Sequence, residues 1–278
     1  MSPSGRLPPS SPPRPLQGDE LSPYRKPGFV HDRFLVMELV KRDFKARYDR
    51  SILGMFWCVL QPTLTMGLLY TVFSVFFRSA IPNFPLYLIS GIVLHQFFVE
   101  TTTSAMRSIQ ENAALIAKVK VPLWTYPVTR AVSSLVNFLF ALIPLFAVVL
   151  LTRVPIRPTM LLFAYSTFCM LLFALGIGLF LAALAVFFHD VKFLWGFACM
   201  LCMYATPIFY PEENLLRAHH WIVYFNPLYH MLHFSRLVLN GRVPPTSEFM
   251  ACLLFALVSI ALGTCLFRSL KNKFALAL

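Results

Sequence analysis

Four basic side chains near the beginning of the chain have the type and spacing to bind an anion. They are Arg42, Lys45, Arg47 and Arg50. Between residues 31 and 50, apolar residues recur every three or four positions, which predicts an amphipathic helix. A basic amphipathic helix lies on a membrane surface with its cations at the level of the phosphate headgroups. A helix with a merely solvated charged face is the alternative interpretation.

Two opposite charges, Glu100 and Arg130, lie inside or beside long apolar stretches. Charged groups at membrane depth are costly and often functional. If the two stretches cross the membrane in opposite directions, both residues lie toward the same side and at similar depth. We therefore predict an intramembrane ion pair between neighbouring helices, and separate snorkelling of both side chains to the headgroups is the alternative.

Metal-binding and catalytic chemistry find little support in the sequence. Residues that could suggest a metal are the histidines His219, His220, His230 and His233 and the pair Cys199 and Cys202. No second cysteine pair or histidine motif completes either set, so we predict no metal site. The chain also lacks a phosphate-binding loop, a nucleophile elbow and a His-Glu-x-x-His motif. We expect no cofactor and no catalysis in this chain, and any ATP hydrolysis must belong to a separate subunit.

The elements that position these groups are long apolar helices. The 278 residues are 58% hydrophobic and 13% charged, whereas soluble domains are roughly 25% charged. This composition predicts an all-α integral membrane protein. Apolar segments long enough to cross a bilayer occur at about 55–77, 84–106, 123–151, 159–188, 193–210 and 249–267, which predicts six transmembrane helices.

Two further segments differ from the spans in composition. Residues 1–28 are rich in proline, which predicts a disordered cytoplasmic tail before a membrane domain at 29–278. Between spans five and six, the apolar stretch Trp221 to Leu232 is too short to cross, and we predict an outer re-entrant hairpin there.

The distribution of Lys and Arg predicts the orientation. With both termini in the cytoplasm, the inner segments carry 17 of these residues and the outer segments carry six. Anionic lipid explains the net charge of +12 better than nucleic acid does, since no nucleic-acid-binding motif accompanies it.

Aromatic residues make up 15% of the chain, and a minority of them could line a passage for sugars, whose rings stack on aromatic faces. Our candidates for the translocation path are Trp57, Tyr70, Phe73, Tyr204 and Tyr210.

Three segments resemble ABC transporter permeases that export polysaccharides, of the O-antigen and teichoic acid exporter type. The first is Val40-Lys41-Arg42-Asp43-Phe44-Lys45-Ala46-Arg47-Tyr48, followed by Ser51, Leu53-Gly54, Trp57 and Gln61-Pro62. The others are Leu115-Ile116-x-Lys118-Val119 with Pro122, and Asn226-Pro227-Leu228-Tyr229. The resemblance extends from about residue 29 to the C-terminus.

The resemblance implies a homodimer in the bacterial cytoplasmic membrane that binds two cytoplasmic ATPase subunits and exports an undecaprenyl-diphosphate-linked glycan. Arg42, Lys45, Arg47 and Arg50 would then hold the diphosphate at the inner surface. The first cytoplasmic loop, residues 107–120, would contact the ATPase through Ser108, Glu111, Asn112, Leu115 and Ile116.

Three other functions remain open at this point. An ABC permease could export a drug or another lipid, and a membrane-embedded transferase could act on a lipid carrier. An ion-coupled transporter is disfavoured because acidic residues are scarce at mid-membrane depth.

Overall fold

The computed structural model describes residues 36–43, 54, 56–77, 81–116 and 121–274. Within these residues all regular structure is helical, which confirms the predicted all-α class. Five elements are long and apolar enough to cross a membrane. These are α2 (Phe56–Phe77), α3 (Phe84–Glu111), α5 (Thr125–Leu151), α6 (Phe163–Ala185) with the preceding 3-10 helix η1 (Pro158–Leu162), and α10 (Thr246–Leu270). The shorter helices are α4 (Ala113–Ile116), α7 (Val191–Ala205), α8 (Glu212–Phe225), α9 (Pro227–Leu239) and η2 (Lys271–Lys273).

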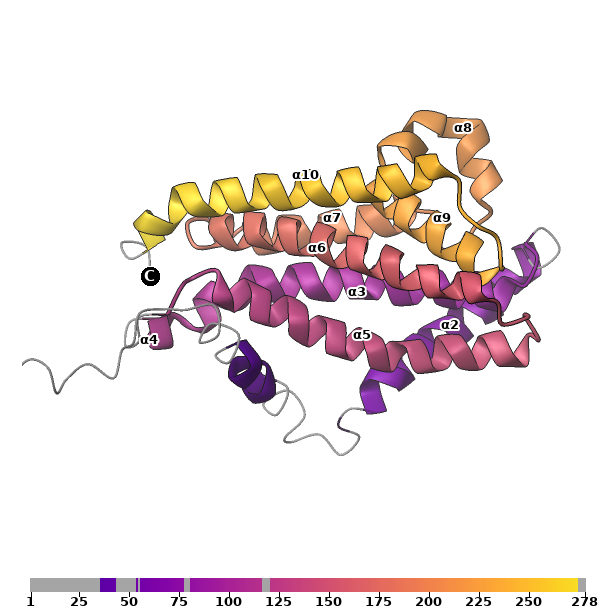
Figure 1. The fold of residues 1–278 in the computed structure, drawn as a ribbon, viewed down its shortest axis with the longest axis horizontal. Helices are drawn as coiled ribbons and strands as arrows, with labels where there is room; N and C mark the ends of the chain where they lie inside the picture. Colours follow the sequence, from indigo (N-terminus) through magenta and orange to yellow (C-terminus); the bar gives the residue numbers. More distant parts are fainter. Residues whose placement is uncertain (1–35, 44–53, 55, 78–80, 117–120, 275–278) are drawn as a thin grey trace, which may run out of the picture.

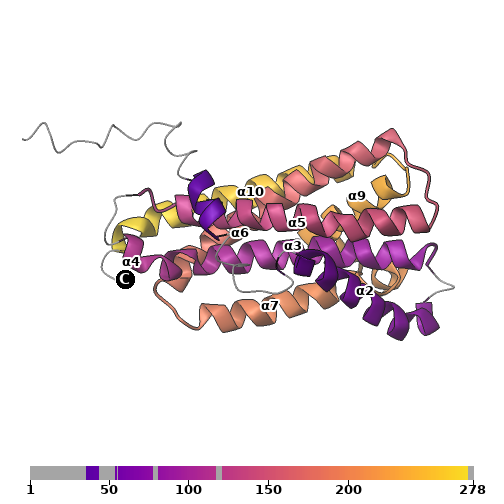
Figure 2. The ribbon, with the colours of Figure 1, turned by 90° about the horizontal axis from the view of Figure 1, so that it is seen from below.

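The core of the bundle is formed by α3, α5, α6 and α10, which run side by side (Figure 1). Helices α3 and α6 are the most buried, because each has a neighbour on both sides. By contrast, α2 and α7 lie against the same side of α3 (Figure 2), and about half of their described residues are exposed. An apolar helix exposed in this way has lipid, or another apolar protein surface, as its surroundings.

Helices α6 and α10 approach each other closely at two glycines. A Cβ atom on Gly263 would lie 2.0 Å from the carbonyl oxygen of Gly176, and one on Gly176 would lie 2.4 Å from Ser259. The Ser259 hydroxyl donates a hydrogen bond of 2.8 Å to the carbonyl of Phe173. Small residues let membrane helices approach until their backbones touch, which compensates for the missing hydrophobic drive between helices in lipid.

Two predicted spans end five residues away from their predicted ends. The second was expected to end at residue 106, but α3 continues to Glu111. The fifth was expected over 193–210, but α7 ends at Ala205, where Thr206 is extended and Pro207 follows. With 15 residues α7 is shorter than a typical span, so six crossings are not confirmed.

The segment between α7 and α10 contains two short helices joined at a proline. The predicted apolar stretch 221–232 is interrupted at Asn226, which ends α8 and caps α9. The Asn226 side chain accepts hydrogen bonds from the backbone N–H groups of Leu228 and Tyr229, and Pro227 occupies the first helical turn, where no N–H is needed.

The bundle has two chemically different ends. We call one the basic end, because it carries Arg107, Arg130, Lys192, Arg268 and Lys271; α4 and η2 lie there (Figure 1). We call the other the hairpin end, formed by the turns at 152–158 and the segment 206–245 with α8 and α9. Of the predicted surface helix at 31–50, residues 36–43 are described, and they are helical. The predicted tail at 1–28 lies outside the described residues.

Candidate functional site

Polar side chains gather at three places in the bundle. A cavity lies among α2, α3 and α5, a group of ion pairs lies at the basic end, and a buried hydrogen-bond network lies at the hairpin end.

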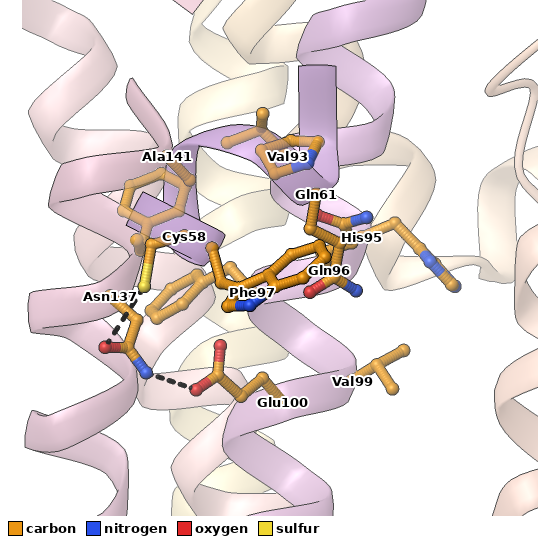
Figure 3. A pocket seen from close by; sticks show the side chains of 13 residues that line it. Cys58, Gln61, Val93, His95, Gln96, Phe97, Val99, Glu100, Asn137 and Ala141 are labelled. Atoms are coloured by element: carbon orange, nitrogen blue, oxygen red, sulfur yellow. Dashed lines mark hydrogen bonds between the residues drawn. The ribbon is translucent and has the colours of Figure 1, made fainter. Parts of the chain in front are cut away.

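The cavity among α2, α3 and α5 has a volume of about 690 Å³ (Figure 3). Its polar lining comes from Gln61, His95, Gln96, Glu100 and Asn137, and its rings from Trp57, Phe97 and Phe138. A volume of this size is typical of ligand pockets. Carboxylate and amide groups can bind the hydroxyl groups of a sugar, and the aromatic faces beside them can stack on its ring.

Asn137 connects the three walls of this cavity. Its amide nitrogen donates to Glu100 Oε1 at 2.5 Å, and its amide oxygen lies 3.7 Å from the Cys58 sulfur (Figure 3). Asn137 on α5 therefore binds the carboxylate of Glu100 on α3, and Cys58 on α2 faces the same amide. An amide that bridges two helices inside a membrane fixes their relative position, because lipid offers its polar groups no alternative partner.

The structure does not pair Glu100 with Arg130, so the predicted intramembrane ion pair between them is wrong. Ser104 lies opposite Ser134, at 3.3 Å between hydroxyls, and Glu100 lies opposite Asn137. In this antiparallel register, Glu100 lies roughly 12 Å deeper than Arg130 at ~1.5 Å per residue. The prediction failed because α3 continues beyond residue 106 and brings Glu111, instead of Glu100, to the depth of Arg130.

Arg130 instead connects three segments at the basic end. Its Nη2 lies 2.7 Å from Glu111 Oε2 at the end of α3, and its Nε lies 3.3 Å from Asp43 Oδ2 in the helical segment 36–43. Arg42 contacts the other Asp43 oxygen at 3.0 Å and donates to Asn112 Oδ1 at 2.9 Å. The surface segment is thus attached to both α3 and α5 through charged side chains that are partly exposed.

Of the four predicted diphosphate-binding residues, only Arg42 is described, and Lys45, Arg47 and Arg50 lie outside the described residues. The guanidinium of Arg42 is half-exposed and directed at Asp43 and Asn112. An added phosphate group could therefore compete with these two partners for the same donors.

The five predicted ATPase contacts have different surroundings. Ser108 and Asn112 are buried: the Ser108 hydroxyl donates to the Ala105 carbonyl, and the Asn112 amide donates to the Ser108 carbonyl. Glu111 is exposed and paired with Arg130. Leu115 and Ile116 are partly buried against the apolar cluster around Tyr126. Among the five, Glu111, Leu115 and Ile116 have surface that a partner could contact.

The hairpin end is organised by Arg236, which is 6% exposed. Its guanidinium donates to the carbonyl of Pro207 at 2.7 Å, of Ile208 at 3.2 Å and of Tyr87 at 3.1 Å. It also lies over the Tyr87 ring, 3.4 Å from the ring centre. The Tyr87 hydroxyl donates to the carbonyls of Pro207 and Tyr210. These bonds hold the irregular backbone after α7, whose carbonyl groups would otherwise be unpaired.

Two histidines in α9 pair with carboxylates beside this network. His233 Nδ1 lies 2.8 Å from Glu212, which also accepts a short hydrogen bond from the Tyr229 hydroxyl. Burial alone would raise the pKa of Glu212, but hydrogen bonds from His233 and Tyr229, with the charge of nearby Arg236, lower that pKa below its ordinary value.

His230 has its own acidic partner. Its Nδ1 lies 3.0 Å from Glu248 and its Nε2 lies 3.2 Å from the carbonyl of Tyr224. Burial opposes a charge here, yet the hydrogen bonds to Glu248 and Tyr224 raise the pKa of His230 above its ordinary value. The imidazole is therefore stabilised in its protonated form.

The predicted aromatic candidates separate into two places. Phe73 stacks on Phe209, with ring centres 4.8 Å apart, and Tyr204 and Tyr210 contact the same ring at 5.7 Å and 5.4 Å. Tyr70 is one turn from Phe73 on α2. Trp57 lies apart from them and lines the polar cavity.

Sequence analysis missed Asn137, Asp43, Tyr87 and Arg236. One signal was present, since Tyr229, His233 and Arg236 are spaced by four and three residues and share one face of α9. Such a polar stripe beside an apolar one indicates a buried network as readily as an exposed surface.

Several known proteins are similar to this chain. Residues 35–240 match the family described as ABC-2 type transporter. The chain is 29% identical over 252 residues to the O-antigen export system permease protein RfbA of Klebsiella pneumoniae, covering 89% of this chain and 95% of that protein. It is 30% identical over 248 residues to the RfbA protein of Myxococcus xanthus, covering 87% and 95%.

A more distant relative is the polysialic acid transport protein KpsM of Escherichia coli, 22% identical over 246 residues, with 87% of this chain and 95% of that protein covered. These relatives are named as permeases or transport proteins, which agrees with the absence of a predicted catalytic centre. The resemblance noted at residues 40–62 is thereby confirmed, and the chain belongs to the ABC-2 type transporter family.

Proposed function

We propose that this chain is the membrane subunit of an ATP-driven exporter, and that it moves a polysaccharide linked to undecaprenyl diphosphate, of the O-antigen or teichoic acid type, out of the cytoplasm. The observation that carries the proposal is the cavity among α2, α3 and α5. It combines a carboxylate and amides with an exposed tryptophan ring in an otherwise apolar bundle. The names of the relatives support the same substrate class.

The proposal includes a topology with the basic end in the cytoplasm and six crossings. Helix α7 measures about 22 Å at ~1.5 Å per residue, and the extended residues after it could cover the remaining ~8 Å of a ~30 Å hydrocarbon core. The segment with α8 and α9 would then return to the outer surface as a re-entrant hairpin. Its network of buried hydrogen bonds supports this placement, because irregular backbone is tolerated at membrane depth only where it is paired.

We further propose a homodimer that assembles through α2 and α7. Both helices lie on one side of α3 and expose large apolar side chains, among them Leu68, Val75, Phe76, Phe193 and Phe197. The aromatic group of Phe73, Tyr204, Phe209 and Tyr210 lies where these two helices approach each other, and Tyr70 is one turn away. In a dimer these rings would border a passage between the two copies.

Two ATPase subunits would bind at the basic end. Glu111 with the apolar Leu115 and Ile116 offers a contact surface there, and Arg42 with Lys45, Arg47 and Arg50 would hold the lipid diphosphate. Because Arg130 connects Glu111 to Asp43, a push on the end of α3 would reach the segment that binds the diphosphate. This connection is our proposed route for coupling ATP hydrolysis to substrate uptake.

The test is glycan-stimulated ATP hydrolysis by the purified complex of this chain with its ATPase partner in lipid nanodiscs. We expect a lipid-linked glycan to stimulate hydrolysis, and Asn137→Leu to abolish most of the stimulation while basal hydrolysis persists. Gly67→Ala on α2 is the matched control, since a Cβ atom at Gly67 meets nothing within 4 Å. Stimulation by an apolar drug or a free phospholipid, but not by the glycan, would overturn the proposal in favour of the alternative exporter.

A further inference from the structure

A second cavity lies at the basic end, on the opposite part of the bundle from the polar one. It has a volume of about 770 Å³ and lies among the start of α5, the middle of α6 and the end of α10. Its walls are Leu123, Trp124, Val128, Leu175, Leu179 and Phe267, which are all apolar or aromatic. A space of this size at the edge of a membrane bundle is open to the acyl chains of lipids.

One face of α10 changes from apolar to cationic along this cavity. Ile260, Thr264, Arg268 and Lys271 follow one another at spacings of four, four and three residues, so they form a single stripe. From Ile260 to Lys271 the stripe is about 16 Å long at ~1.5 Å per residue. The order along it, hydrocarbon first, then a hydroxyl, then two cations, is the order of groups in a phospholipid from chain to phosphate.

The two cations at the mouth are available to a ligand. Both Arg268 and Lys271 are exposed, and across the part of the chain that the structure describes neither forms an ion pair. Among the described residues, no acidic side chain lines the cavity. Trp124 on the facing wall is 43% exposed, and tryptophan prefers the headgroup level of a bilayer.

We infer that this cavity binds one anionic phospholipid, with its phosphate between Arg268 and Lys271 and one acyl chain along Leu175 and Leu179. Charge complementarity determines the headgroup, since basic pockets between membrane helices bind anionic lipids. The apolar walls favour an acyl chain over a glycan, because a sugar needs several polar partners. Of the described lining residues, Thr264 alone offers a side-chain hydroxyl below the cations. The inference does not depend on the exported substrate.

The first test measures phosphatidylglycerol binding by native mass spectrometry of the full chain in detergent, with phosphatidylcholine as the neutral comparison. A Lys or Arg near an anionic surface contributes about a fivefold gain in affinity. We therefore expect Arg268→Gln with Lys271→Gln to weaken phosphatidylglycerol binding about 30-fold and to leave phosphatidylcholine unchanged. Equal binding of the two lipids by the wild-type chain would overturn the inference.

The matched control removes the same two charges elsewhere at the basic end. Arg107→Gln with Lys192→Gln changes one exposed arginine and one exposed lysine that do not line the cavity. We expect phosphatidylglycerol binding to stay within about twofold in this control. A loss as large as in the cavity variant would mean general attraction to the basic end and would overturn the assignment.

A third variant tests the acyl chain. Thr264→Phe fills part of the cavity but keeps both cations, and displacing two methylene groups costs about tenfold in affinity at roughly 0.8 kcal/mol each. Unchanged binding in Thr264→Phe would contradict a chain in the cavity. Undecaprenyl phosphate added as a competitor should not displace the phospholipid, and displacement at equal concentration would assign the cavity to the carrier lipid instead.

Discussion

The two ends of the bundle use charged residues in different ways. At the hairpin end, Arg236 is buried and bonded to three backbone carbonyls, so its charge serves to hold irregular backbone in place. At the basic end, Arg130 pairs with Glu111, which is 47% exposed, and with Asp43, a largely buried carboxylate that also contacts the half-exposed Arg42. Buried networks are costly to break, whereas exposed ion pairs contribute little and rearrange readily. We conclude that the hairpin end is the rigid region and the basic end the adaptable one.

The largest expected effect is from replacing Arg236 by leucine. Three carbonyl groups would lose the guanidinium as a hydrogen-bond donor, and only that of Pro207 would keep its bond from the Tyr87 hydroxyl among the bonds described above. Breaking such a buried network costs about 3–5 kcal/mol. The melting temperature in detergent should fall by about 10 °C, at roughly 2–4 °C per kcal/mol for a chain of this size. Arg236→Lys keeps the charge but loses the planar guanidinium, so its melting temperature should lie between those of the wild type and Arg236→Leu. A melting temperature within 2 °C of the wild type for Arg236→Leu would, on the same scale, contradict a rigid hairpin end.

A smaller effect is expected from Gly91→Ala, which touches the same network from α3. The added methyl group would lie 2.9 Å from the Ile208 side chain and 3.1 Å from Arg236 Nη2. Overpacking of this kind costs about 1–3 kcal/mol. Gly196→Ala on α7 is the control, because its Cβ atom meets nothing within 4 Å, and it should stabilise α7 slightly through better helix propensity. Thermal unfolding of the two variants measures the difference. Equal melting temperatures would contradict the claim that Gly91 is packed tightly against the Arg236 network.

At the basic end, Arg130→Gln should destabilise the protein by only about 1 kcal/mol, since its partner Glu111 is half-exposed and screened by salt, and its other partner, the largely buried Asp43, keeps its contact with Arg42. A double-mutant cycle with Glu111→Gln, followed by thermal unfolding at low and high salt, measures the pair. We expect a coupling energy of about 0.5–1 kcal/mol that decreases with salt. A cost equal to that of Arg236→Leu would show that the two ends are equally rigid.

The smallest predicted effect depends on pH. The folded-state pKa of His230 is raised, so its ion pair with Glu248 contributes stability that is complete below the ordinary value of 6.5 and is lost as the pH rises through the folded value. Between pH 6 and pH 8, the melting temperature should therefore fall by about 1–2 °C more in the wild type than in His230→Gln. Parallel pH profiles for the two proteins would exclude this contribution.

Much of the fold follows from hydropathy and spacing. The expected span at 123–151 corresponds closely to Thr125–Leu151, and the expected 249–267 lies within Thr246–Leu270. The errors have a common cause, because hydropathy reports where a segment leaves the hydrocarbon and not where its helix ends. Thus α3 ends five residues after its predicted end at 106, and α7 ends five residues before the predicted end at 210.

The sites were harder to predict because they depend on which helices are neighbours. Glu100 and Arg130 were matched by charge, but the register of α3 against α5 gives each a different partner. Arg236 was one of the six basic residues assigned to the outer segments, since a sequence shows that a residue is basic and not that its guanidinium donates to three carbonyls. Family resemblance supplied the function class that neither hydropathy nor spacing could provide.

The contact between Gly176 and Gly263 has an evolutionary consequence. Since any side chain at either position would overlap the backbone of the other helix, selection leaves a single admissible amino acid at both. Neutral substitutions can exchange apolar residues on the surfaces of α6 and α10. A substitution at either glycine, however, requires that the two helices move apart at the same time. A survey of close homologues should find the two glycines retained together or lost together.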